Sequence, residues 1–142
     1  MTHSSSKRRA IVVGGSLGGL FAANMLMRKG WDVEVFERVP DELAGRGAGI
    51  VTHPELYEAM AVAGIPLDTS IGIDVHSRVT LAQGGSVVLE KAHPQTLTAW
   101  GKMYQVLRAA FPDSQYRCGG NVVSVESTPT HASVTLSDGT TH

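Results

Sequence analysis

The sequence has few of the features that mark disulfide-bonded, membrane-spanning or nucleic-acid-binding chains. Its single cysteine, Cys118, excludes an internal disulfide pair, and we expect it to lie buried in a strand of a protein kept in a reducing compartment. The net charge is −1, which does not favour nucleic acid or an anionic membrane as a partner. No apolar run approaches the roughly 20 residues that a membrane-spanning helix needs. These absences predict a soluble, cytoplasmic globular protein.

Two further absences concern the N-terminus and the histidines. Residues 1–9 are polar and lack the apolar core of a secretory signal, so we expect a disordered arm there and one domain over residues 10–142. None of the six histidines stands at a metal-ligand spacing from another histidine, a cysteine or an acid. The sequence therefore predicts no metal site.

The chain does contain, over residues 10–38, the pattern of a strand, a turn, a helix and a second strand. Residues 10–13 are apolar and β-branched, as in a strand buried on both faces of a parallel sheet. The apolar residues that follow have helical spacing up to Gly30, which predicts a helix that ends there. Residues 31–36 alternate apolar side chains and end in Glu37. This order predicts an α/β fold built on a parallel βαβ unit.

The turn between strand and helix, GGSLGG, points to a phosphate-binding function. Backbone N–H groups and the positive end of a helix can approach a pyrophosphate where glycines leave room. The pattern G-x-G-x-x-G is met at Gly14 and Gly19, with Ser16 in the middle place. Such a turn can also serve strand-to-helix packing alone, but Glu37 lies 18 residues beyond Gly19, where an acid can hold ribose hydroxyls. We therefore predict that the chain binds a dinucleotide.

A resemblance to a known family begins at the same residues. With Ala23 and Gly30 the motif extends to G-x-S-x-x-G-x-x-x-A, which resembles the fingerprint of flavoproteins with a Rossmann-like FAD domain of the glutathione reductase type. Residues 45–50, GRGAGI, resemble the G-x-G-I segment of FAD-dependent aromatic hydroxylases of the para-hydroxybenzoate hydroxylase type. The runs VVGGSLGGL and ERVPDELAGRGAGIVTHPEL are similar to the dihydroxypyridine hydroxylase subgroup, in which serine also replaces the middle glycine.

This resemblance implies an FAD-dependent monooxygenase that uses NAD(P)H and O2 to hydroxylate a small aromatic or hydroxypyridine ring. It assigns no catalytic residues, and it leaves open whether the full-length form is a homodimer. For Arg46, which the resemblance assigns to phosphate or flavin, the alternative is an arginine that is simply exposed to solvent. The cofactor-binding candidates are Gly14, Ser16, Leu17, Gly18 and Gly19 for the pyrophosphate and the turn, Glu37 for the ribose, Arg38 beside the adenine, Arg46 for phosphate or flavin, and Val123, whose backbone lies near the adenine in the family.

The rest of the chain predicts an antiparallel excursion and further strands. We expect a helix from Pro54, a hairpin over residues 73–81 and 86–90, a helix over 98–111, strands over 116–118 and 121–127, and a hairpin arm over 132–136. In most of the resembling family the second of these helices begins with an arginine that meets the flavin. Trp100 stands at that register here, and Lys102 or Gln105 would have to compensate.

The resemblance also implies that the domain is incomplete at its C-terminus. The family continues with a G-A-D-G segment and later a G-D-x-x-H segment, and neither is present, so we expect an N-terminal portion of an FAD-binding domain. The alternative is an NAD(P)-binding reductase module or an inactive nucleotide-binding fragment. Glu37 disfavours the 2′-phosphate of NADP by charge repulsion, although Arg38 weakens that argument.

Overall fold

The computed structural model describes residues 7–43, 45, 47–66 and 71–142. Its first elements form the expected βαβ unit, with β1 (Arg9–Val13), α1 (Leu17–Arg28) and β2 (Asp32–Glu37). Arg9, which the sequence placed in the N-terminal arm, is the first residue of β1. Gly30 has φ +83°, a left-handed conformation that ends the helical segment and reverses the chain into β2.

A parallel sheet with the order β1-β2-β6 forms the centre of the molecule, where β6 is Tyr116–Cys118. β2 lies between the two other strands, and its residues Val33 and Val35 have no exposed surface. Its apolar residues Val33, Val35 and Phe36 are buried, whereas Asp32 and Glu34 are only partly buried. The carboxyl ends of all three strands meet at one edge, because all three are parallel.

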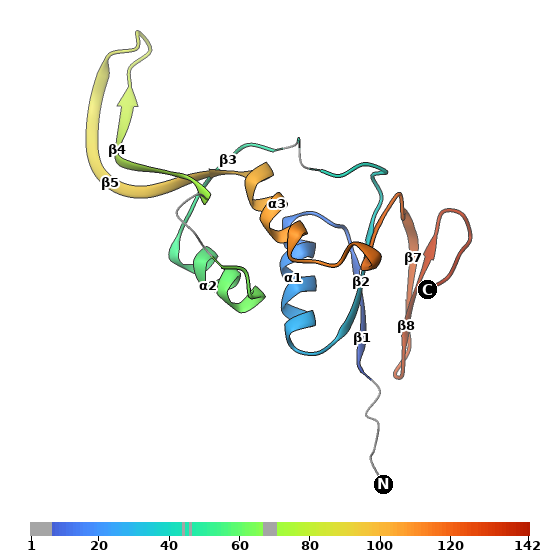
Figure 1. Ribbon diagram of the computed structural model, residues 1–142. Coiled ribbons are helices and arrows are strands. Elements are labelled where there is room, and N and C mark those ends of the chain that lie inside the picture. Colours follow the sequence, from blue (N-terminus) through green and yellow to red (C-terminus); the bar gives the residue numbers. More distant parts are fainter. Residues whose placement is uncertain (1–6, 44, 46, 67–70) are drawn as a thin grey trace.

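Three helices lie on one side of this sheet (Figure 1). They are α1, α2 (Pro54–Ala63) and α3 (Trp100–Ala109), and a short 3-10 turn, η2 (Asp113–Gln115), leads into β6. Pro54 occupies the first turn of α2, as the sequence predicts, and Gly64 caps the C-terminus of this helix at φ +74°. Leu20 of α1, Met60 of α2 and Leu107 of α3 are completely buried in the common core.

The side chain of Asn24 joins α1 to α3 by a hydrogen bond. Asn24 of α1 is 3% exposed, and its Nδ2 donates to the carbonyl oxygens of Leu20 at 2.9 Å and of Leu107 at 3.0 Å. The second bond reaches the last turn of α3, where carbonyl groups lack helical partners.

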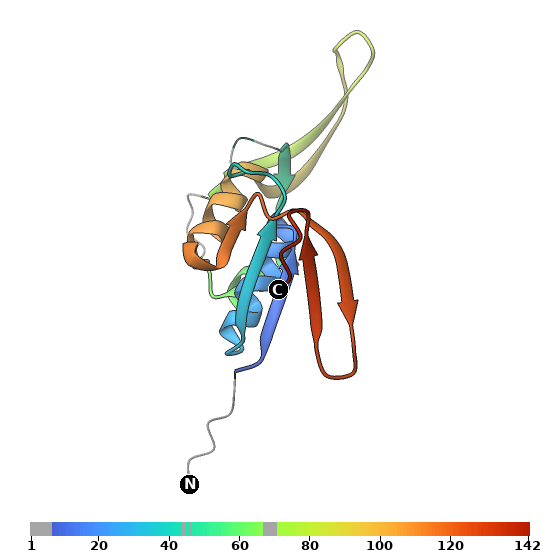
Figure 2. The ribbon, with the colours of Figure 1, turned by 90° about the vertical axis from the view of Figure 1, so that its right-hand side faces the viewer.

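An antiparallel sheet with the order β3-β5-β4 extends away from this body (Figures 1 and 2). It consists of β3 (Gly49–Val51), β4 (Ile73–Leu81) and β5 (Val87–Ala99). The prediction that β5 ends at residue 90 was wrong, because the strand passes through Pro94 at a bulge, where residues 93 and 94 face His76 alone. Proline is tolerated in a strand at such a bulge. Consequently α3 begins at Trp100 rather than at residue 98.

The ribbon formed by β4 and β5 exposes many apolar side chains. Two strands without a layer beneath them cannot bury both faces. The exposed apolar residues of β4 and β5 are Ile73, Val79, Leu81, Val87, Val88, Leu89 and Leu97.

A hairpin of β7 (Val122–Ser127) and β8 (Ala132–Leu136) lies on the side of the parallel sheet opposite the helices (Figure 2). After the turn at Gly139 the chain returns, and His142 exchanges two backbone hydrogen bonds with Val134. Cys118, expected to be buried, lies in β6 but is exposed. Among the described residues, no helix is both long enough and apolar enough to cross a membrane.

Candidate functional site

The turn after β1 and the end of β2 lie side by side at the carboxyl edge of the parallel sheet. Val13 pairs with Phe36, so Gly14 directly follows β1 beside the last residue of β2, Glu37. The Gly14 N–H donates to the Phe36 carbonyl at 2.8 Å. In open α/β sheets this edge is where ligands bind. The fold therefore brings together the glycine turn and the acid that the sequence singled out.

Two glycines of the turn have geometric roles that only glycine fills easily. Gly14 has φ +99°, which side-chain-bearing residues rarely adopt. A Cβ on Gly19 would overlap the carbonyl oxygen of Gly14 and stand 3.3 Å from Cγ1 of Val12. Gly19 therefore allows α1 to start close against β1, the packing role of the last glycine in such turns.

Gly15 is held from both sides by groups from distant parts of the chain. Its N–H donates to Oε2 of Glu37 at 2.8 Å, and its carbonyl accepts from the Tyr116 hydroxyl at 2.9 Å. Oε1 of Glu37 accepts from the N–H of Val39 at 3.0 Å. Glu37 is only 6% exposed, so this carboxylate stabilises the turn as well as standing at the edge where we predict ribose binding. This role of Glu37 could not be predicted from the sequence, because nothing in the local pattern pairs Glu37 with Gly15.

Open space and polar groups surround Ser16, Leu17 and Gly18 at the start of α1. Ser16 is the N-cap residue and is exposed, and its side chain makes no capping hydrogen bond. A Cβ on Gly18 would meet no atom within 4 Å. The first turn of a helix carries N–H groups without helical partners and the positive end of the dipole. The surface around Ser16, Leu17 and Gly18 can therefore receive an anion.

A cleft of about 150 Å³ opens beside this turn. It is lined by Val13, Gly14, Phe36, Glu37, Arg38, Gly120, Asn121 and Val122. Arg38 is exposed there, next to the buried Glu37 carboxylate. One wall thus offers a carboxylate and a guanidinium, and Gly14 adds no side chain to fill the space.

Two predicted site residues fall outside this cleft or outside the described structure. Val122 lines the cleft, while the side chain of Val123 is 60% exposed. Val123 lies at a register shift, where the pairing of β7 with β8 passes from Val122 directly to Ser124. The contact of its backbone with adenine stays a prediction. Arg46 lies outside the described residues.

Trp100, at the register of the family arginine, takes part in packing. Its ring stacks on that of Tyr104 with centroids 5.2 Å apart and planes within 7°. A Cβ on Gly47, which has φ +103°, would run into the Trp100 side chain.

His53 lies at the N-cap of α2 and is exposed, and its Nδ1 lies 2.9 Å from Oε2 of Glu55. Nothing in this geometry assigns His53 to catalysis.

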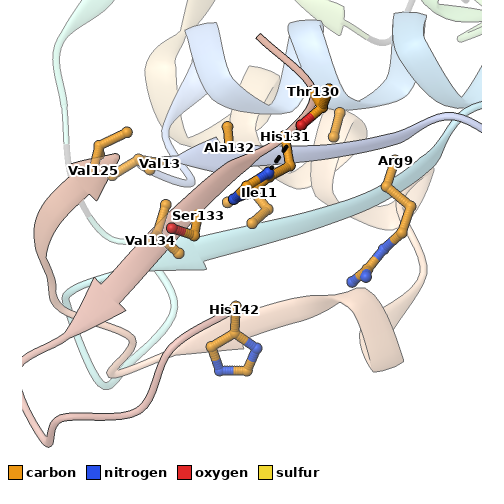
Figure 3. Close-up of a pocket in the computed structure, with 11 residues that line it drawn as sticks. Arg9, Ile11, Val13, Val125, Thr130, His131, Ala132, Ser133, Val134 and His142 are labelled. Carbon is orange, nitrogen blue, oxygen red and sulfur yellow. Dashed lines mark hydrogen bonds between the residues drawn. The ribbon is translucent and has the colours of Figure 1, made fainter. Parts of the chain in front are cut away.

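A larger cavity of about 500 Å³ lies on the side of the parallel sheet opposite the helices, between β1 and the β7–β8 hairpin (Figure 3). It is lined by Arg9, Ala10, Ile11, Val13, Val125, Thr130, His131, Ala132, Ser133, Val134 and His142. No backbone group of the glycine turn lines it, and Val13 alone borders both spaces. The smaller cleft is therefore the better candidate for the nucleotide, because it adjoins the phosphate-binding turn.

Comparison with known proteins agrees with this geometry. No family model matches the chain. It is 33% identical over 141 residues to 2,6-dihydroxypyridine 3-monooxygenase of Paenarthrobacter nicotinovorans, covering 96% of this chain and 34% of that protein. It is 30% identical to the FAD-dependent monooxygenase penM of Penicillium crustosum, over 92% of this chain and 30% of that protein.

The solved structure of 2,6-dihydroxypyridine-3-hydroxylase from Arthrobacter nicotinovorans superimposes with a TM-score of 0.84 at 34% identity, covering 98% of this chain and 35% of that one. The chain thus spans about a third of the length of the relatives it matches. By sequence, the chain is thus similar to about a third of FAD-dependent monooxygenase penM and, by sequence and by fold, to about a third of a monooxygenase that acts on 2,6-dihydroxypyridine.

Proposed function

We propose that this chain supplies the ADP half of the FAD site in a monooxygenase that hydroxylates an aromatic or hydroxypyridine ring with NAD(P)H and O2. The observation that carries the proposal is the glycine turn, which is open at Gly14 and Gly18 and adjoins a cleft containing Glu37 and Arg38. We further propose that the FAD domain is of the glutathione reductase type, on the basis of the extended glycine motif.

The residues present fit an adenine dinucleotide in three respects. A Cβ added at Gly14 or Gly18 would occupy space that is now open, as expected where a backbone must approach a diphosphate closely. The N-cap Ser16 leaves its hydroxyl available for a phosphate oxygen. The Glu37 carboxylate accepts one hydrogen bond at each oxygen, and each oxygen has capacity for a second from a ribose hydroxyl.

When bound, FAD supplies the redox chemistry, and the residues of this chain hold and orient its ADP portion. The N–H groups at the start of α1 and the Ser16 hydroxyl bind the pyrophosphate. Glu37 binds ribose hydroxyls while it keeps Gly15 in place. Arg38, which lines the cleft, would contact the adenine. Arg46, Val123 and Leu17 complete the proposed cofactor-binding set.

Nucleotide binding by the 142-residue chain tests this proposal directly. In isothermal titration calorimetry, FAD and ADP should bind, whereas FMN, which lacks the ADP half, should bind at least tenfold more weakly. Gly18→Ala should weaken ADP binding, because its Cβ would project into the phosphate space, without loss of thermal stability. Equal binding of FMN and FAD, or no binding of ADP at millimolar concentration, would contradict the proposal.

The reaction itself is tested in the whole protein. A hydroxypyridine or another electron-rich aromatic substrate should accelerate NAD(P)H consumption and yield a hydroxylated product. Consumption without any ring hydroxylation would point to a different flavin-dependent reaction.

A further inference from the structure

The hydroxyl of Tyr116 is a buried group that the proposed cofactor contacts do not use. Tyr116 opens β6, where it pairs with Val35, and only 7% of its surface is exposed. Its hydroxyl donates to the Gly15 carbonyl at 2.9 Å across 101 residues of sequence. A Cβ on Gly15 would stand 2.5 Å from Cζ of the Tyr116 ring, so the ring and the turn are in direct contact.

A second tyrosine fixes the direction of this hydrogen bond. The hydroxyl of Tyr104, a completely buried residue of α3, lies 3.3 Å from that of Tyr116. Because the one proton of Tyr116 goes to Gly15, Tyr104 must be the donor between the two hydroxyls. The result is a chain of hydrogen bonds that runs from Tyr104 through Tyr116 to the turn, and members of such a chain strengthen one another.

Tyr116 keeps its proton over the physiological pH range. Burial, and after it the hydrogen bond with Tyr104, raises the pKa of the Tyr116 hydroxyl well above its ordinary value near 10. The guanidinium of Arg108 lies 4.3 Å from the centroid of the Tyr116 ring and holds the ring from its face. The hydroxyl is therefore a fixed donor.

The hydrogen bond to Gly15 determines where the following N–H group points. In a trans peptide the C=O and N–H bonds point in opposite directions, and no cis peptide occurs among the described residues. The Gly15 carbonyl is drawn into the core towards Tyr116, so the N–H of Ser16 in the same peptide points away from the core. Ser16 is exposed at the start of α1, where the proposed pyrophosphate would lie.

We propose that Tyr116 is a positioning residue for pyrophosphate binding, which holds the Gly15–Ser16 peptide so that the Ser16 N–H faces the phosphate. This inference rests on the proposed function and adds to it a residue outside the proposed cofactor-binding set. The role differs from simple core packing because it depends on the hydroxyl and on its single acceptor, Gly15.

The matched pair Tyr116→Phe and Tyr104→Phe tests the proposal. Each variant loses one buried hydroxyl, but only Tyr116→Phe removes the hydrogen bond to the turn. In calorimetric titrations of the 142-residue chain, ADP affinity should fall about three- to twelvefold in Tyr116→Phe, the usual effect of one lost hydrogen bond, and less than about threefold in Tyr104→Phe. Thermal melts of both variants ensure that binding is measured on folded protein.

An NMR measurement supplies a readout that core packing would not move. Titration of the ¹⁵N-labelled chain with pyrophosphate should shift the Ser16 amide signal strongly in the wild type and in Tyr104→Phe, and weakly in Tyr116→Phe. Equal ADP affinity of the wild type and Tyr116→Phe would overturn the inference, as would equal losses in the two variants. Failure of the wild type to bind ADP would instead refute the proposed function.

Discussion

Two neighbouring glycines of α1, Gly18 and Gly19, should respond in opposite ways to the same substitution. A Cβ on Gly19 would overlap the carbonyl oxygen of Gly14 and lie 3.0 Å from its carbonyl carbon. Both atoms belong to the backbone of the turn, so they cannot move aside as a flexible side chain would. At Gly18 the same methyl group meets no atom within 4 Å.

The expected magnitudes follow from these contacts. Overpacking of a close contact costs about 1–3 kcal/mol, and the backbone walls around Gly19 place it near the upper end. Replacing glycine by alanine in a helix returns about 0.5–1 kcal/mol. We therefore expect Gly19→Ala to lower the free energy of unfolding by about 2 kcal/mol, and Gly18→Ala to raise it by about 0.5 kcal/mol.

Urea denaturation and thermal melts measure both effects. A loss of 2 kcal/mol should lower the melting temperature of a chain of this size by about 4–8 °C. The two variants should also separate stability from binding, since Gly18→Ala should be at least as stable as the wild type but bind ADP more weakly. A destabilised Gly18→Ala, or a Gly19→Ala as stable as the wild type, would refute the assignment of close packing to Gly19 and open space to Gly18.

Three further substitutions test other contacts. Asn24→Ala removes both hydrogen bonds that join α1 to itself and to α3, and should lower the free energy of unfolding by about 1–3 kcal/mol in urea; a change below about 0.5 kcal/mol would contradict this. Glu37→Gln turns one acceptor into a donor facing a backbone N–H, so it should lower both the melting temperature and ADP affinity, and unchanged values of both would argue against the role of Glu37. The hydrogen bond from Arg117 lowers the pKa of Glu34, so the ionised carboxylate stabilises the fold above its unfolded-state pKa of about 4.3, and that stabilisation is lost as the pH falls through the lower folded-state pKa. Glu34→Gln should therefore be less stable than the wild type by up to about 1 kcal/mol near pH 7, and this difference should shrink as the pH falls through the lowered pKa of Glu34; a difference independent of pH would contradict the pairing.

The βαβ unit could be predicted from the sequence because its signals are local. The apolar strand, the glycine turn and Gly30 act on their immediate neighbours, and the structure confirms the resulting order of elements and the parallel pairing of β1 with β2. The resemblance carried by these motifs is likewise confirmed by the relatives. The continuation of β5 through Pro94 was missed because a proline normally ends a strand and the bulge that tolerates it depends on the partner strand.

The interactions that shape the turn could not be predicted in the same way. Gly15 is joined to Glu37 across 22 residues and to Tyr116 across 101, and no periodicity or motif encodes such pairs. Tyr116 at the start of a short strand looks like an ordinary core residue in the sequence. Only its position beside β2 in the folded sheet brings the hydroxyl to the turn.

The two hydrogen bonds that hold Gly15 have a consequence for the order in which parts of the chain fold. The contact with Glu37 needs only the first βαβ unit, whereas the contact with Tyr116 needs the third strand to dock, and contacts so distant in sequence form slowly because a long loop must close first. A nascent chain that ends before residue 116 therefore has the glycine motif but lacks one of its two restraints. The chain should then become able to bind a nucleotide late in folding, and its affinity should reach the final value only when β6 joins the sheet.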